Sequence, residues 1–122
     1  MTEAANFHPV FISLKKILLP YAKQLVLKCD EVDEFHVDTE FVMKNKRPMY
    51  FGSVKINKNY VSFHLMPVYV FPDLAKDMSP ELKRRMQGKS CFNFKTIDVA
   101  LFQELTELAK SGYIEYQKSG YL

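Results

Sequence analysis

The sequence predicts a single α+β domain over residues 1–122, in which an antiparallel sheet of four or more strands carries the N- and C-terminal helices on one face. Helix-like spacing of apolar residues lies near the two ends of the chain, while the middle alternates apolar and polar residues with a period of two. A length of 122 residues with 48% hydrophobic and 25% charged residues suits one ordinary globular core. Helices outside a run of strands favour the α+β class.

The first predicted element is a helical segment that begins at Pro9. Its apolar residues recur at steps of three and four and form one stripe, made of Phe11, Leu14, Leu18, Tyr21 and Leu25. Pro20 lies within this pattern and removes a helical hydrogen bond, so we expect a kinked helix or two short helices joined there. The sequence DEVDE at 30–34 then forms an acidic connector.

Three strands are predicted next, at about 35–42, 48–57 and 60–67. The segments between them, 44–47 and 57–59, are short and polar, which favours an antiparallel meander. In the third strand Val61, Phe63 and Leu65 alternate with polar neighbours, so they predict the buried face. Residues 69–77 are predicted to form a loop or a short helical turn.

The segment SPELKRRMQGKSCFNFK at 79–95 predicts a helix followed by a strand. Ser79 is a good N-cap and Pro80 suits the first helical position. We expect a helix over 80–87 that ends at Gly88, and then a strand over 91–95 that buries Phe92 and Phe94.

The last predicted helix begins at Asp98, a second N-cap residue, and runs to about Lys118. Leu101, Leu105 and Leu108 carry its apolar stripe. Together with the first helix it would seal the apolar face of the sheet.

Four motifs give the chain a family resemblance over roughly residues 35–122. They are VSFHL at 61–65, SPEL at 79–82, GKSCFNF at 88–94, and the tail residues Leu105, Leu108, Gly112 and Tyr116. With these motifs the chain resembles the YdhG-like family of small bacterial cytosolic proteins. The resemblance implies a fold similar to frataxin and the role of an iron chaperone. Proteins of iron–sulfur cluster or haem assembly would then be its partners.

An acidic cluster is the predicted metal site, because the iron role implied by the resemblance relies on exposed carboxylates. No Asp or Glu occurs from Phe7 to Cys29, and the cluster that follows consists of Asp30, Glu31, Asp33 and Glu34. Carboxylate oxygens suit hard cations, including iron. The alternative is a solvated connector before a strand.

A sheet covered on one side leaves its second face open to solvent or a ligand. The polar residues predicted on that face include Lys55, His64, Asn93 and Lys95, which we predict to bind a small molecule, an anion or a partner's segment. An uncovered face or edge also predicts a homodimer.

Histidine and cysteine side chains offer an enzymatic alternative. His36 and His64 would form a cross-strand pair if their strands were neighbours in the right register, and with Asp38 or Glu40 nearby that pair would be a metal or acid–base set. Cys29 and Cys91 are candidate nucleophiles, and Lys95 on the same side as Cys91 would lower the pKa of its thiol. The alternative for each is an ordinary packed or surface residue.

Composition argues against several classes. A net charge of +3 and a pI near 8.8 are modest for a nucleic-acid-binding protein, so Lys44, Lys46, Arg47, Lys83, Arg84 and Arg85 are interpreted as solvated turns and a helix end. No apolar run approaches the roughly 20 residues that span a membrane. Two cysteines without metal spacing and no signal peptide predict a cytoplasmic protein with reduced thiols. The sequence therefore favours a non-enzymatic cytosolic binding or accessory protein, either a frataxin-like iron chaperone or an anion-binding domain. An enzyme that uses Cys91 or His64 is less favoured.

Overall fold

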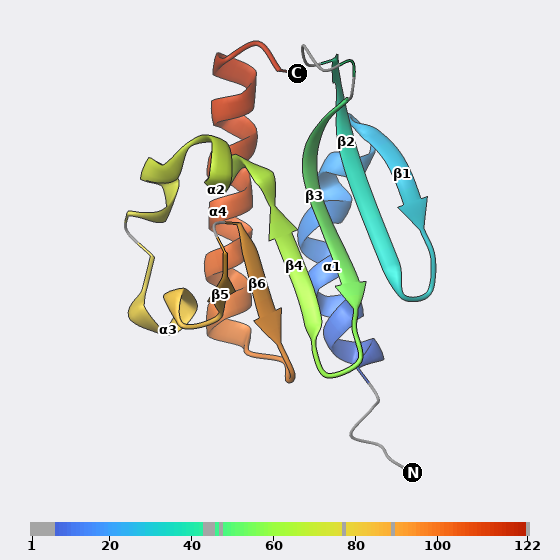
Figure 1. Cartoon of the computed structure of the whole chain (residues 1–122), viewed down its shortest axis with the longest axis vertical. Coiled ribbons are helices and arrows are strands. Elements are labelled where there is room, and N and C mark those ends of the chain that lie inside the picture. Colours follow the sequence, from blue (N-terminus) through green and yellow to red (C-terminus); the bar gives the residue numbers. More distant parts are fainter. Residues whose placement is uncertain (1–6, 43–45, 47, 77, 89, 122) are drawn as a thin grey trace.

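The structure is a computed structural model that describes residues 7–42, 46, 48–76, 78–88 and 90–121, without the side chains of Glu40, Val42 and Pro48. Its elements are α1 (His8–Ala22), β1 (Val26–Asp30), β2 (Glu34–Val42), β3 (Pro48–Ile56), β4 (Val61–Leu65), α2 (Met66–Val70), the 3-10 helix η2 (Pro72–Ala75), α3 (Pro80–Lys83), β5 (Met86–Gln87), β6 (Cys91–Phe94) and α4 (Val99–Lys118). The sheet forms one layer, and α1 and α4 lie side by side behind it (Figure 1). The predicted α+β class, an antiparallel sheet with N- and C-terminal helices, is confirmed.

Within the described residues the sheet has six strands in the order β1-β2-β3-β4-β6-β5, and every neighbouring pair is antiparallel. The strands predicted at 35–42, 48–57, 60–67 and 91–95 correspond to β2, β3, β4 and β6. The turn between β3 and β4 closes with a hydrogen bond from the Asn57 amide to the Tyr60 carbonyl, 2.8 Å long. The predicted meander is therefore confirmed from β2 to β4.

The prediction for the first helix was wrong at its C-terminal end. The helix α1 ends at Ala22, so Pro20 lies in its last turn and Leu25 lies beyond it. The Tyr21 carbonyl accepts from the amides of residues 24 and 25, which closes the helix. The chain then enters β1, an outer strand whose register against β2 shifts at a bulge between Leu27 and Cys29. The acidic connector is thus the hairpin turn between β1 and β2.

The helix predicted over 80–87 is also shorter than expected. The helix α3 ends at Lys83, and Met86 and Gln87 form β5, which pairs with β6. Gly88 has a φ of 84° and lies in the turn after β5, so its left-handed conformation serves a hairpin and does not end a helix. The segment from Pro80 to the start of β5 has only six residues, 80–85, which is too short for a long helix.

The hydrophobic core lies between the sheet and the helices α1 and α4. Phe63 of β4 and Phe92 of β6 are fully buried on the same face, with ring centroids 6.5 Å apart. The fully buried side chains that face them from the helices include Leu14, Leu18 and Leu105. The predicted alternation of β4 and β6 is confirmed, because the even positions of β4 and the odd positions of β6 are only half-buried.

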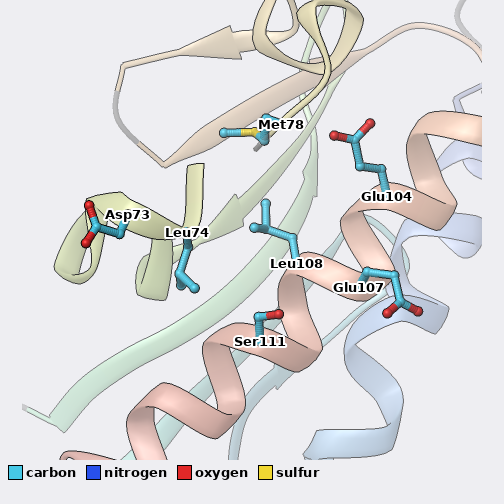
Figure 2. A pocket seen from close by; sticks show the side chains of 7 residues that line it. All are labelled: Asp73, Leu74, Met78, Glu104, Glu107, Leu108 and Ser111. Atoms are coloured by element: carbon cyan, nitrogen blue, oxygen red, sulfur yellow. The ribbon is translucent and has the colours of Figure 1, made fainter. Parts of the chain in front are cut away.

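The N-cap of α3 is tied to the long helix α4. Ser79 accepts a hydrogen bond from the Leu82 amide at 3.1 Å, as its cap role predicts. The Glu104 carboxylate accepts from the Ser79 amide and from its hydroxyl, each at 2.7 Å. Figure 2 shows Glu104 reaching from α4 toward the segment that carries Met78. This contact fixes α3, and with it the start of β5, against the helical layer.

Two glycines allow close approach between elements. A Cβ atom on Gly52 of β3 would lie 3.1 Å from a methyl group of Leu18, so this glycine lets α1 pack onto the sheet. A Cβ atom on Gly112 of α4 would lie 2.6 Å from the Cβ of Pro67 in α2. The absence of a side chain at residue 112 therefore sets how closely α2 and α4 pack.

Candidate functional site: the open face of the sheet

The face of the sheet opposite α1 and α4 carries rows of polar side chains. In one row Lys55 of β3 pairs with Ser62 of β4, which pairs with Asn93 of β6. In the next row Ser53, His64 and Cys91 are cross-strand partners in the same order. The predicted open face therefore exists, and three of the four predicted ligand-binding residues lie in these two rows.

Three rings cross the centre of this face from β2 to β4. The His36 ring lies 4.5 Å from the Tyr50 ring, and the Tyr50 ring meets His64 edge-on at 4.8 Å, measured between centroids. A His36 nitrogen lies 2.7 Å from an Asp38 carboxylate oxygen, and His64 shares a hydrogen bond with the buried Ser90 hydroxyl. His36 and His64 are not cross-strand neighbours, because β3 lies between their strands. Tyr50 fills the space between them instead.

Burial keeps the central groups uncharged at neutral pH. Burial raises the pKa of the Tyr50 hydroxyl, against a smaller opposite effect of its hydrogen bond with Ser53. Burial, and to a smaller extent the nearby His36, lowers the pKa of His64. Burial also raises the pKa of the Cys91 thiol, opposed by a hydrogen bond with Ser62. The structure thus gives no support to the idea that Lys95 activates Cys91.

A hollow of about 260 Å³ opens at the end of this face formed by β5 and β6. The residues that line it are Tyr60, Arg84, Arg85, Met86, Gln87, Asn93 and Lys95. Arg84, Arg85 and Lys95 are cationic and exposed, and none of the described residues that line the hollow is acidic. A concave surface with this charge favours an anion.

Strand pairing explains why these residues meet. The Asn93 amide donates to the Arg85 carbonyl at 2.9 Å, which brings the end of α3 beside β6. Lys95, the first residue after β6, follows Asn93 by two residues and also lines the hollow. Tyr60 immediately precedes the neighbouring strand β4 and also lines the hollow.

The predicted ligand-binding residues divide into two pairs. Asn93 and Lys95 line the hollow, whereas Lys55 and His64 lie on the same face outside it. Sequence reasoning noticed the two arginines only as a helix end, and it missed Tyr60, Met86 and Gln87 as site residues. Met86 and Gln87 carried no usable signal, because the pattern placed them inside a helix.

The acidic cluster predicted to bind metal lies in the turn between β1 and β2. Asp30 forms an ion pair with Lys15 of α1 at 2.6 Å, while Glu31 and Asp33 are exposed. Among the described residues, no group of three or more His, Cys, Asp or Glu side chains is arranged to hold a metal ion. Iron binding by Asp30, Glu31, Asp33 and Glu34 stays a prediction.

A second hollow, of about 270 Å³, lies between η2 and α4 and has carboxylates on its rim. Figure 2 shows Asp73 and Glu107 on opposite sides of it, with Leu74 and Leu108 between them. The carboxylate of Glu104 is already used by Ser79. The acidic groups therefore do not converge on one ligand.

The remaining predictions concern partners and the membrane. Lys44, Arg47 and the side chain of Glu40 lie outside the described residues, and Lys46 is exposed. Within the described part of the chain, no helix is both long and apolar enough to span a membrane. The absence of a nucleic-acid partner, the homodimer and the assembly-protein partners stay predictions.

Comparisons of the chain with family models, with curated proteins and with solved structures found no match. The resemblance to the YdhG-like family therefore also stays a prediction, and the geometry of the open face is the basis for a functional proposal.

Proposed function

We propose that this protein is a non-enzymatic binding protein that holds a small anionic ligand in the hollow at the β5–β6 end of its open sheet face. The observation that carries the proposal is the concave lining with Arg84, Arg85 and Lys95 and without an acidic residue among those described. Arg84 is paired with Glu81 of α3, whose carboxylate lies 3.7 Å from the Arg84 guanidinium. The other two cations that line the hollow, Arg85 and Lys95, are available to contact a ligand.

The backbone around the hollow supports binding because it is fixed. The hydrogen bond from the Asn93 amide to the Arg85 carbonyl joins the two sides, and the Ser79–Glu104 contacts hold α3 from behind. A fixed backbone lowers the entropy that is lost when a ligand binds.

The electrostatics support binding over catalysis at this face. The Cys91 thiol has a raised pKa, so little of it is thiolate at neutral pH, and the thiolate is the reactive form. His64 is half-buried and already shares a hydrogen bond with Ser90. Neither group resembles an activated nucleophile or a free base.

A titration with sulfate tests the proposal. Sodium chloride is replaced stepwise by sodium sulfate at constant ionic strength, and the amide NMR spectrum of isotopically labelled protein is recorded. We expect saturable shifts at Gln87, Asn93 and Lys95. Exposed charge contacts contribute up to about 1 kcal/mol each, so the two available cations give about 2 kcal/mol and a dissociation constant of about 30 mM is expected.

Matched variants locate the site. Arg85→Gln and Lys95→Gln should each weaken binding about 3- to 5-fold, because each removes one exposed charge contact. Lys110→Gln, which removes an exposed charge from α4 on the other side of the molecule, should leave binding unchanged. Shifts spread evenly over the surface, or an equal effect of all three variants, would refute the proposal.

A further inference from the structure

The two amide side chains in the hollow are oriented by hydrogen bonds. The Asn93 side-chain NH₂ group donates to the Gln87 side-chain oxygen at 2.5 Å, and the Cys91 thiol donates to the Asn93 side-chain oxygen at 3.7 Å. Each of the two amide oxygens therefore already accepts one hydrogen bond. The Gln87 NH₂ group and the second hydrogen of the Asn93 NH₂ group remain to donate to a ligand.

The cationic side chains have the same hydrogen-bonding character. Guanidinium and ammonium groups donate and cannot accept, and the Tyr60 hydroxyl can donate as well. The hollow therefore presents mainly hydrogen-bond donors to a ligand. Because donors outnumber the remaining acceptors, it suits oxygens that carry no proton, such as those of a carboxylate, better than the NH₂ groups of a neutral amide.

The size and lining of the hollow point to more than one charged group. At roughly 30 Å³ per water molecule, a hollow of about 260 Å³ exceeds a single carboxylate several-fold. Arg85 lies beside Asn93, and Lys95, the first residue after β6, lies two residues farther along the chain, which is at most about 7 Å. Tyr60 adds apolar surface to the lining.

From these observations we infer that the ligand is a small aliphatic dicarboxylate. One carboxylate contacts the arginine side of the hollow, the other contacts Lys95, and the hydrocarbon between them contacts Tyr60. The inference rests on the proposed function, since it names the chemical class that the same hollow selects.

Four probes of graded chemistry test the inference in the same NMR assay. Succinate is the dicarboxylate, succinamide is its neutral counterpart of nearly equal shape, acetate is the monocarboxylate, and sulfate is the compact dianion. We expect succinate to bind about 5- to 10-fold more tightly than acetate or sulfate, and we expect no saturable shift with succinamide.

Two variants test the donor character directly. Gln87→Glu and Asn93→Asp keep the shape of the side chain and replace an NH₂ donor by a carboxylate oxygen, so each should weaken succinate binding at least 10-fold. Gln87→Ala, which only removes the donor, should weaken it about 2- to 3-fold. The spectrum of each variant shows whether it is folded, and exposed Gln87 keeps the test valid if Asn93→Asp unfolds the protein.

The outcomes separate the two proposals. If sulfate binds at the hollow but succinate binds no better than acetate, the dicarboxylate inference is wrong and anion binding stands. If succinamide binds as well as succinate, or Gln87→Glu leaves succinate binding unchanged, the donor argument is wrong. If none of the anions shifts the amides of the hollow, both proposals fall.

Discussion

Replacing Gly112 by alanine tests the packing of α2 on α4, because two known effects predict opposite signs. Alanine in the interior of a helix is favoured over glycine by about 1 kcal/mol. The new Cβ, however, would lie 2.6 Å from Pro67 Cβ and 2.9 Å from Pro67 Cγ, in a ring that cannot rotate away. Ordinary carbon contacts need about 3.5–4.0 Å, so the two helices must separate by about 1 Å. Overpacking of this kind costs about 1–3 kcal/mol. We expect Gly112→Ala to lower the free energy of unfolding by about 1 kcal/mol.

The assay is urea unfolding followed by circular dichroism, with thermal unfolding as a second measure. A loss of about 1 kcal/mol should lower the melting temperature by about 4 °C in a domain of this size. Ser111→Ala is the matched control, because residue 111 is exposed in the same turn and its change should raise stability by about 0.5 kcal/mol. If Gly112→Ala stabilises the protein as the control does, the close approach of Pro67 is refuted.

Three further predictions follow from the open face, the hairpin turn and the cap of α3. The pKa of His64 in the folded protein lies below its ordinary value of 6.5, so as pH falls the unfolded chain takes up a proton before the folded protein does. The contribution of neutral His64 to stability is therefore lost as pH falls from about 6.5 to the lower pKa of the folded state. Unfolding measured between neutral and mildly acidic pH should show a smaller loss in His64→Gln, and an unchanged slope would contradict the sign. The pKa of the Cys29 thiol is raised by burial and then by Glu34, so Glu34→Gln should speed its alkylation by iodoacetamide while Cys91, the internal control, keeps its rate. Glu104→Ala should lower stability by about 1–3 kcal/mol because it removes both hydrogen bonds to the N-cap of α3, and Glu104→Gln, which keeps an acceptor oxygen, should lose less.

The elements that the sequence predicted best are those with strong local signals. The alternation around Phe63 and the N-cap residues Ser79 and Asp98 led to β4, α3 and α4, and the Asp98 carboxylate accepts from the Leu101 amide at 3.1 Å as a cap should. These signals depend on neighbours in the chain, so they can be read without knowing the fold.

Elements that depend on distant partners were missed. The apolar spacing of α1 runs on to Leu25, immediately before β1, and only the pairing of β1 with β2 makes the following residues a strand. The short strand β5 exists because β6 offers it an edge. Tertiary pairing overrode local propensity in both places.

The candidate site could be predicted only in part for the same reason. Asn93 and Lys95 were placed on the open face by their alternation with Phe94. The arginines lie beside them because α3 ends at Lys83 and the chain then turns back to pair with β6. The sequence predicted a longer helix and therefore did not bring these residues together. The hollow therefore appears only once β5 and β6 are paired.

The bulge in β1 has a consequence for how the protein behaves at high concentration. An outermost strand with a regular ladder of free amides and carbonyls is a template on which further chains can add, and such growth ends in insoluble fibres. Interrupting the ladder between Leu27 and Cys29 removes that regularity, and the exposed Lys28 at the interruption adds a charge that repels a second copy laid against it. The outer edge of β1 can thus stay uncovered without pairing with the edge of a second copy of the chain.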